Sequence, residues 1–388
     1  MEPGPKTQRF TFRTVAEIQH GWGAARCLGD ALGAFGPARR VLVVTDRALR
    51  ATGLLEPALE SLASHRFDVA IYDGVQADPP ESNVLEAADM AKSFRAELVV
   101  GFGGGSSLDV AKLAAVLAVS HQALRELYGI GKVSGHRLPL VQIPTTAGTG
   151  SEVTNISILS TGQSKMGIVA PQLFADLVLL DAELTVGLPR LHTAAAGIDA
   201  MVHAIEAYTS RHLKNPVSDC LAVAALRLLT ANLLTACETP GDRPAREAML
   251  LGAMLAGQAF ANAPVAAVHA LAYPLGGRYH IPHGLSNALM LGPVLRFNLP
   301  AATKEYAELG AAIGVSGSDE TDIARGFVAH LDALCRQSGA PVRLRDLDVA
   351  KADLALMAND AMNQQRLLRN NPTDVTEADA LRLYEEAY

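Results

Sequence analysis

Short apolar runs rich in β-branched residues alternate with helix-like segments in the first half of the chain. Five runs are predicted to be strands: 40–46, 67–73, 97–101, 138–145 and 176–181. Segments in which apolar residues repeat with a helical period lie between several of them, as at 54–65 and 81–94. Near-continuous apolar strands separated by helices are typical of a parallel sheet that is covered on both faces. The first half is therefore predicted to be an α/β domain.

The hydrophobic pattern changes at Gly187-Leu188-Pro189. Beyond this point the strand signals stop, and Ala- and Leu-rich helical periods continue to the end of the chain, broken by short loops. We therefore place a domain boundary at residue 188, with an α/β domain over 1–188 and an all-helical domain over 189–388. Within the first domain, a Thr-Gly turn between apolar runs predicts a β-hairpin over 155–169.

Composition narrows the classes of function. Hydrophobic residues make up 49% of the 388 residues and charged residues 19%, which is enough apolar material for a large core. The net charge is -7 and no Lys/Arg cluster stands out, so we expect no nucleic-acid partner. The uncharged stretch 248–277 is long enough to span a membrane. Its Gln, Asn, His and Pro residues favour buried helices instead, and we expect no membrane partner.

The cysteines and the amino terminus bear on the compartment. Cys27, Cys220, Cys237 and Cys335 lie far apart and form no CxxC pair, which is unlike a disulfide framework or a thiolate zinc site. The first ten residues contain no apolar run, so no secretory signal is visible. Both observations favour a reducing environment, and we expect the protein to be cytoplasmic.

A glycine loop follows the third predicted strand. Gly103-Gly104-Gly105-Ser106 stands between this strand and a helix predicted over 107–120. In a strand–glycine turn–helix unit, backbone N–H groups and the helix N-terminus can bind phosphate oxygens, and glycine lets a pyrophosphate approach the backbone. The spacing is not GxGxxG, so an ordinary tight turn remains the alternative. The unit favours a Rossmann-like, dinucleotide-binding domain.

Two further features lie at strand ends of this domain. Asp46 ends the first predicted strand, where an acidic side chain can accept hydrogen bonds from the adenosine ribose and would repel a 2′-phosphate. A hydroxyl-rich loop over 144–151 ends another strand and could donate to phosphates or to the nicotinamide amide. The alternatives are a solvated aspartate that caps the next helix and a solvent-exposed turn.

One aspartate and three histidines in the helical half have the character of metal ligands. Asp199 and His203 are four residues apart and would share one face of a helix. His269 and His283 follow in apolar settings, and Pro282 would fix the direction of the latter at a predicted helix start. A divalent ion with these four ligands keeps coordination positions open for a substrate oxygen, as a Lewis-acid catalyst requires. Each histidine alone could be an ordinary core residue, but a buried Asp199 without a cation would be costly.

Tyr273 and His280 lie near these four residues in the sequence. Either side chain could relay a proton from a substrate hydroxyl to solvent. The alternative for both is packing or solvent exposure without a role in the reaction.

Four motifs together resemble the iron-containing (group III) alcohol dehydrogenase family. They are GGGSSLDVAK (103–112), IPTTAGTGSEVT (143–154), AAGIDAMVHAIEAY (195–208) and HALAYPLGGRYHIPHG (269–284). The resemblance runs through nearly the whole chain. It implies a dinucleotide-binding domain followed by a helical metal domain, and a homodimer.

The resemblance also implies roles for individual residues. Phe260 is expected to line the substrate pocket near the nicotinamide, and metal ligation is expected of Asp199, His203, His269 and His283. Cofactor contacts are expected at Asp46, Gly104, Gly105, Ser106, Asp109, Thr145, Thr146, Thr149 and Lys165, with Asp46 favouring NAD over NADP. The sequence departs from the family at Tyr273, where many members have a histidine, and at Asp78, where an asparagine is common.

The activity expected from these features is reversible hydride transfer between a small alcohol or aldehyde and NAD, with the substrate oxygen on a divalent metal. The expected metal is Fe(II), with Zn(II) as the alternative, because nitrogen and oxygen ligands do not decide between them. The rival enzymes are a hydroxyacid–oxoacid transhydrogenase and a maleylacetate-reductase-like enzyme, the latter differing at the metal positions. The rival from another class is a nucleotide- or metal-binding protein without activity.

Overall fold

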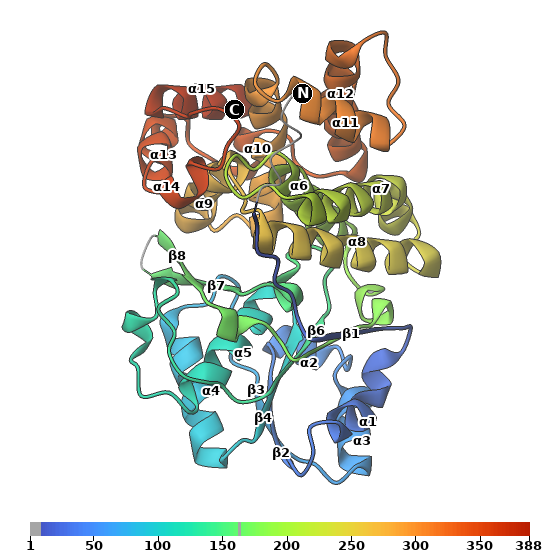
Figure 1. Ribbon diagram of the computed structural model, residues 1–388, viewed down its shortest axis with the longest axis vertical. Helices are drawn as coiled ribbons and strands as arrows, with labels where there is room; N and C mark the ends of the chain where they lie inside the picture. The colour runs from blue at the N-terminus through green and yellow to red at the C-terminus, as the bar shows by residue number, and fades with distance from the viewer. Residues whose placement is uncertain (1–8, 162–163) are drawn as a thin grey trace, which may run out of the picture.

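The computed structural model describes residues 9–161 and 164–388, which form two domains (Figure 1). The α/β domain occupies the lower part of the view and the helical domain the upper part. The last strand of the first domain ends at Leu180, and the first long helix of the second begins at Arg190. The predicted boundary at residue 188 falls between these two elements, and its position stays a prediction.

A parallel sheet of six strands forms the centre of the α/β domain. Its spatial order is β1-β9-β6-β4-β2-β3, and every neighbouring pair is parallel. Five of the strands confirm the predicted runs, whereas β1 consists of exposed and partly exposed residues that no apolar run marks. The strands are β1 (Glu17–His20), β2 (Arg40–Val44), β3 (Asp68–Tyr72), β4 (Leu98–Gly103), β6 (Leu140–Pro144) and β9 (Leu177–Leu180).

Alternate residues of each strand face opposite sides of the sheet, as the pleat requires. On one side, Val41 and Val43 of β2 belong to a buried cluster with helices α1 and α3. On the other side, Leu42 and Val44 belong to a cluster with α4 and α5 that continues into the helical domain. Helices thus cover both faces, as the near-continuous apolar strands predict. These helices are α1 (Leu28–Gly33), α3 (Glu56–Ser64), α4 (Glu81–Phe94) and α5 (Gly105–Leu117).

A three-stranded sheet with the order β5-β8-β7 is appended to this domain. The strands β7 (Ile156–Thr161) and β8 (Ser164–Val169) pair antiparallel, which confirms the predicted hairpin. The short strand β5 (Gly129–Ile130) pairs with β8 in parallel. Gly162 of the predicted turn, and most of the amino-terminal segment in which no secretory signal is visible, lie outside the described residues.

Helices form the second domain, as the periodicity predicts. The helices α6, α7 and α8 pack on one another, and α9 and α10 pack together with α10 also against α6. The helix predicted to start at Pro282 is α10, in which Pro282 is the N-cap residue. The helices are α6 (Arg190–Tyr208), α7 (Pro216–Glu238), α8 (Arg243–Asn262), α9 (Ala267–Tyr279), α10 (His283–Asn298), α11 (Thr303–Ala312), α12 (Glu320–Ser338), α13 (Leu354–Ala361), α14 (Gln365–Leu368) and α15 (Glu377–Ala387).

Two regions of this domain are apolar enough to be compared with membrane spans. Within the described residues, α7 passes by length and composition, with a mean hydropathy of 1.8. The uncharged stretch 248–277 spans α8 and α9, which meet at an angle of 105°. Ala256, Ala259 and Leu271 of this stretch are fully buried, as expected of core helices.

The two domains meet where α8 lies against the loop that follows β6 (Figure 1). Gly150 of this loop has a φ of 59°, and a Cβ built on it would lie 2.6 Å from the Cα of Gly257 in α8. Only glycine allows this approach, because any side chain at either position would separate the backbones. The amino-terminal segment crosses the same junction, where Arg13 N donates to Asn262 Oδ1 at 2.7 Å. The helical domain is thereby held over the carboxyl end of the sheet.

A fully buried lysine joins α5 to the same loop. Lys112 Nζ donates to Ser151 Oγ at 2.7 Å, to the carbonyl of Ile156 at 2.6 Å and to Asp109 Oδ1 at 3.2 Å. Burial lowers the pKa of the Lys112 amine, whereas the Asp109 carboxylate opposes this shift. The buried ammonium therefore exchanges its hydration for several protein oxygens, and its loss would remove a donor from each of them and the counterion from Asp109.

We expect Lys112→Ala to destabilise the protein by about 3 kcal/mol, because it removes the counterion of Asp109 and a donor to Ser151 Oγ and the Ile156 carbonyl. Equilibrium urea denaturation measures this loss. Lys92→Ala is the matched control, since Lys92 on α4 is exposed and pairs with Asp89 at 4.0 Å. It should change stability by less than about 0.5 kcal/mol. Equal effects of the two substitutions would contradict the role given to Lys112.

Candidate active site

The order of strands leaves a crevice at the carboxyl ends of β2 and β4. From β2 the chain continues to β3 on one side, and it then returns to form β4 on the other side of β2. Ligands of open α/β sheets bind at such a switch point. A groove of about 1170 Å³ lies there, and its lining includes Asp46, Gly104, Gly105, Ser106, Thr145 and Thr146.

The glycine loop presents the N-terminus of α5 to this groove. Gly104 is the N-cap residue, and no side chain among the described residues caps the helix, so first-turn N–H groups are available to an anion. A Cβ on Gly104 would have no protein atom closer than 3.7 Å, which leaves a cradle open to a ligand. A Cβ on Gly105 would lie 2.9 Å from Thr149, so this glycine serves packing. The helix begins two residues before the predicted start of 107, because Gly105 and Ser106 already belong to its first turn.

Asp46 lies at the strand end where a ribose-binding carboxylate is predicted, and it also caps the next helix, which is the alternative role. Its Oδ1 accepts the N–H of Leu49 at 2.8 Å and so caps α2 (Arg47–Ala51). The same carboxylate lines the groove. Among the described residues its Oδ2 has no hydrogen-bond partner, which leaves one oxygen for a ribose hydroxyl.

A second cavity, of about 200 Å³, shares Gly105 and Ser106 with the groove. Three residues with predicted cofactor contacts, Asp109, Thr149 and Lys165, line this cavity and not the groove. Asp109 accepts from Ser151 Oγ at 2.6 Å and from the N–H of Ile158 at 2.8 Å. Both of its carboxylate oxygens are therefore engaged by the protein, and a cofactor contact at Asp109 stays a prediction.

Lys165 is also held by a protein partner. Its Nζ donates to Asp78 Oδ1 at 2.6 Å, at the position where the sequence departs from the family's asparagine. The Lys165 side chain is 6% exposed, and the ion pair neutralises it where it lines the cavity. A cofactor contact at Lys165 stays a prediction.

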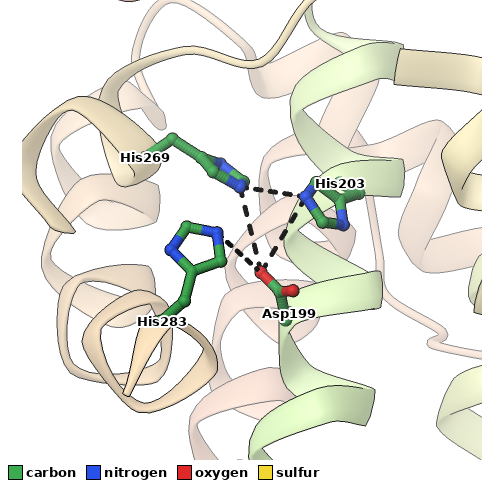
Figure 2. Close-up of side chains that lie close together, drawn as sticks. All are labelled: Asp199, His203, His269 and His283. Carbon is green, nitrogen blue, oxygen red and sulfur yellow. Dashed lines mark hydrogen bonds and ion pairs between the residues drawn. The ribbon is translucent and has the colours of Figure 1, made fainter. Parts of the chain in front are cut away.

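The four predicted metal ligands converge in the helical domain (Figure 2). Asp199 and His203 share one face of α6, His269 comes from α9 and His283 from the first turn of α10. Their ligand atoms all lie within 4.8 Å of one another. Asp199 Oδ1 lies 3.9 Å from the Nε2 atoms of His203 and His269 and 3.6 Å from that of His283. The three imidazoles border the smaller cavity.

The electrostatics of the cluster favour a cation. Burial raises the pKa of Asp199, but His203, His283 and His269 outweigh burial and hold this pKa below its usual value. Burial lowers the pKa of His203 to about 4 and that of His283 to about 3. Near neutral pH the cluster therefore contains the Asp199 carboxylate and the uncharged imidazoles of His203 and His283, which are the forms that bind metal.

The hydrogen bonds of the cluster also fit a bound ion. The Nε2 atoms of His203 and His269 lie 3.0 Å apart, and two lone pairs at this distance need a cation or a shared proton between them. Asn287 Nδ2 donates to Asp199 Oδ1 at 2.6 Å, while its own Oδ1 is buried without a partner in the described part of the chain. One carboxylate and three imidazoles match the ligands of Fe(II) and Zn(II) sites. The residues present fit a divalent metal.

A second carboxylate, Glu206, supports one of the ligands. Its Oε2 lies 2.6 Å from His269 Nδ1, which assigns the proton to Nδ1 and leaves the Nε2 lone pair toward the cluster. The same carboxylate accepts from the N–H groups of Ala266 at 2.9 Å and Val268 at 2.7 Å, at the start of α9. Glu206 therefore fixes both the orientation of His269 and the helix that carries it.

The other predicted site residues separate into two groups. Phe260 stacks on His203 with ring centroids 4.2 Å apart, and Tyr273 lies 6.2 Å from His283 by the same measure. Both line the smaller cavity. His280 is exposed, ends α9 in the left-handed region with φ 53° and does not line the cavity. A proton relay through His280 to solvent stays a prediction.

The structure adds three residues that the sequence analysis missed, namely Glu206, Asn287 and Arg366. Glu206 follows His203 by three positions and Asn287 follows His283 by four. Helix periodicity places each of them on the same face as the neighbouring ligand, so the sequence contained a signal for both residues. Arg366 lines the smaller cavity from α14, and no periodic signal links it to the histidines.

Comparison with known proteins identifies the class to which this fold and site belong. A model described as "Iron-containing alcohol dehydrogenase" matches residues 16–182. A second, described as "Fe-containing alcohol dehydrogenase family, C-terminal", matches residues 193–388. The chain belongs to the iron-containing alcohol dehydrogenase family, as its motifs imply, and it is an oxidoreductase that acts on alcohols.

Individual relatives cover nearly the whole chain. Long-chain-alcohol dehydrogenase 1 of Geobacillus thermodenitrificans is 41% identical over 98% of this chain and 96% of its own length. The NAD-dependent methanol dehydrogenase of Bacillus methanolicus is 33% identical over 95% and 97%, respectively. The structure of an alcohol dehydrogenase from Oenococcus oeni superposes with a TM-score of 0.93 at 30% identity, covering 98% of this chain and 100% of that one. These similarities confirm the predicted fold class and the predicted alcohol dehydrogenase activity.

We expect Glu206→Gln to weaken metal binding by about 10- to 100-fold, because the amide is a poorer acceptor for His269 and brings a donor against the N–H groups of α9. Competition with a chromogenic chelator measures the affinity for Fe(II) or Zn(II). Glu238→Gln, at the exposed end of α7, is the matched control and should leave the affinity unchanged. An unchanged affinity in Glu206→Gln would contradict the supporting role of this carboxylate.

Proposed function

We propose that the protein transfers a hydride reversibly between a small alcohol and NAD, with a divalent metal held by Asp199, His203, His269 and His283. The observation that carries this proposal is that the groove at the sheet and the cavity at the histidines share Gly105 and Ser106. A dinucleotide along the groove would therefore have its far end beside the histidines. The NAD-dependent methanol dehydrogenase relative supports the choice of cofactor.

The metal and NAD would each supply one part of the chemistry. A divalent ion among these four ligands supplies a Lewis acid toward a substrate oxygen. NAD supplies the hydride acceptor or, when reduced, the donor. We propose Fe(II) as the native ion on the strength of the family's description, with Zn(II) fitting the same nitrogen and oxygen donors.

The chain's own residues position the substrate and exclude water. Phe260, Val265 and Ile158 give the cavity apolar walls beside the histidines, and a dry site strengthens every polar interaction within it. Burial raises the pKa of Tyr273, so its phenol stays protonated near neutral pH and can donate a hydrogen bond into the cavity. Glu206 fixes the orientation of the His269 imidazole.

Reduction of aldehydes tests this function. Each turnover converts one aldehyde, one NADH and one proton into an alcohol and NAD, so the decay of NADH absorbance reports the rate. We expect turnover of small aldehydes by the protein loaded with Fe(II) or Zn(II), and loss of turnover after chelation. No turnover with either metal across an aldehyde panel would favour the rival of a binding protein without activity.

His269→Ala should remove bound metal and lower kcat/KM by about 100-fold or more, because a Lewis acid contributes several kcal/mol to the transition state. Metal analysis and NADH binding are measured together, and NADH affinity should be nearly unaffected. His330→Ala on α12 is the matched control, since this histidine is exposed. Full metal content in His269→Ala would refute the proposed ligand set.

Asp46→Asn should raise the ratio of kcat/KM for NADPH over NADH by about 10-fold or more. The substitution keeps an oxygen that can cap α2 and removes the charge that would repel a 2′-phosphate. Asp73→Asn is the control, since Asp73 lines the same groove but is paired with Arg50 at 2.6 Å. An unaltered ratio in Asp46→Asn would count against its role in cofactor choice.

We also propose that the protein is a cytoplasmic homodimer. The four cysteines are free thiols, and Cys27 and Cys220 are exposed, which suits a reducing compartment. The strand β1 lies at the edge of the six-stranded sheet, and an edge strand can pair with a second copy. Cell fractionation and sedimentation velocity test these two statements.

A further inference from the structure

Arg366 brings a guanidinium into the cavity beside the histidine cluster. It lies on the short helix α14 in the helical domain, and it lines the smaller cavity but not the groove of the proposed cofactor. Its side chain reaches the hairpin of the other domain, where a Cβ on Gly167 of β8 would lie 3.5 Å from Arg366 Nη2. The guanidinium therefore closes one wall of the cavity.

The other charges that line the cavity have partners. Lys165 is paired with Asp78 at 2.6 Å, and Asp109 is engaged by Lys112 and Ser151. In the described part of the chain, no carboxylate lies within 4.0 Å of Arg366. Arg366 is therefore the charge of this cavity that the protein leaves without a counterion.

Tyr273 connects Arg366 to the reacting end of the cavity. Burial raises the pKa of the Tyr273 phenol, and the charge and hydrogen bonding of Arg366 oppose that rise, so the two groups are neighbours. The ring of Tyr273 lies 6.2 Å from that of His283. One tyrosine side chain thus bridges the distance between the guanidinium and the cluster. A molecule with its oxygen at the cluster needs only a few carbon atoms to reach Arg366.

We propose that Arg366 binds the anionic end of a short substrate, an aldehyde or alcohol whose far carbon carries a carboxylate or a sulfonate. The planar guanidinium can donate two parallel hydrogen bonds to either anion. A cavity of about 200 Å³ restricts this substrate to a small molecule. This inference rests on the proposed function, since it names the substrate class of the same site.

Matched pairs of aldehydes test the proposal on the metal-loaded enzyme with NADH. Succinic semialdehyde is compared with isocaproaldehyde, and sulfoacetaldehyde with tert-butylacetaldehyde, because each pair differs mainly in charge at similar size. We expect kcat/KM to be higher for the anionic aldehyde than for the neutral one in at least one pair. Arg366→Met should lower the anionic-to-neutral ratio for that pair by about 10- to 100-fold, mainly through KM, as the loss of a charge-assisted hydrogen-bond pair predicts. The preferred pair distinguishes carboxylate from sulfonate.

Two further variants complete the test. Arg366→Lys keeps the charge but not the planar pair of N–H donors, and it should retain part of the preference for the anionic aldehyde. Arg369→Met, three residues further on and exposed, should leave the ratio as in the wild type. If Arg366→Met lowered kcat/KM equally for both aldehydes of a pair, Arg366 would serve only to pack the hairpin or Tyr273, and the proposal would be overturned. A wild-type preference for the neutral members would do so as well, whereas a failure of all four aldehydes would contradict the proposed function itself.

Discussion

The buried charge of Asp199 is the constraint on which the rest of this structure depends. The side chain lies in the middle of α6, where it is 1% exposed and has no access to bulk water. An isolated carboxylate in such a place would cost several kcal/mol. Asn287 of α10 donates one hydrogen bond to this carboxylate, and the Nε2 atoms of His203, His269 and His283 converge on it from three helices. Uncharged imidazoles do not neutralise a carboxylate, so a cation bound among these four groups would compensate the charge.

Buried charged groups and one close backbone contact also determine how the two domains are joined. Glu206 accepts from the first N–H groups of α9, so the second buried carboxylate of α6 sets the position of the helix that carries His269. The backbone approach of Gly150 to Gly257 then seats α8 against the loop beyond β6. Because that loop also meets the buried amine of Lys112, the junction is tied to α5, whose N-terminus faces the groove. The distance between the nucleotide groove and the histidines is therefore set by close-packed contacts.

Much of this arrangement can be predicted from the sequence, and what cannot has identifiable physical causes. The apolar runs predict five strands because parallel strands are buried on both faces, whereas β1 at the sheet edge carries mostly exposed residues and gives no such signal. The i, i+4 spacing predicts that Asp199 and His203 share a face. No local pattern shows that Arg366 reaches the hairpin or that Ser151 and Ile158 occupy the carboxylate of Asp109. Those contacts join segments that are far apart in the sequence, and only the tertiary fold brings them together.

The replacement of a family histidine by Tyr273 limits how protons can move in this site. A phenol whose pKa is raised by burial cannot accept a proton near neutral pH, but it donates a hydrogen bond throughout the range in which His203 and His283 are uncharged. His280 does not line the cavity and lies exposed at the end of α9. The guanidinium of Arg366 beside the phenol stabilises the orientation in which the hydroxyl hydrogen points away from the positive charge. Tyr273 is thus suited to hold and polarise a substrate oxygen, and proton exchange with solvent must follow a route that does not deprotonate it.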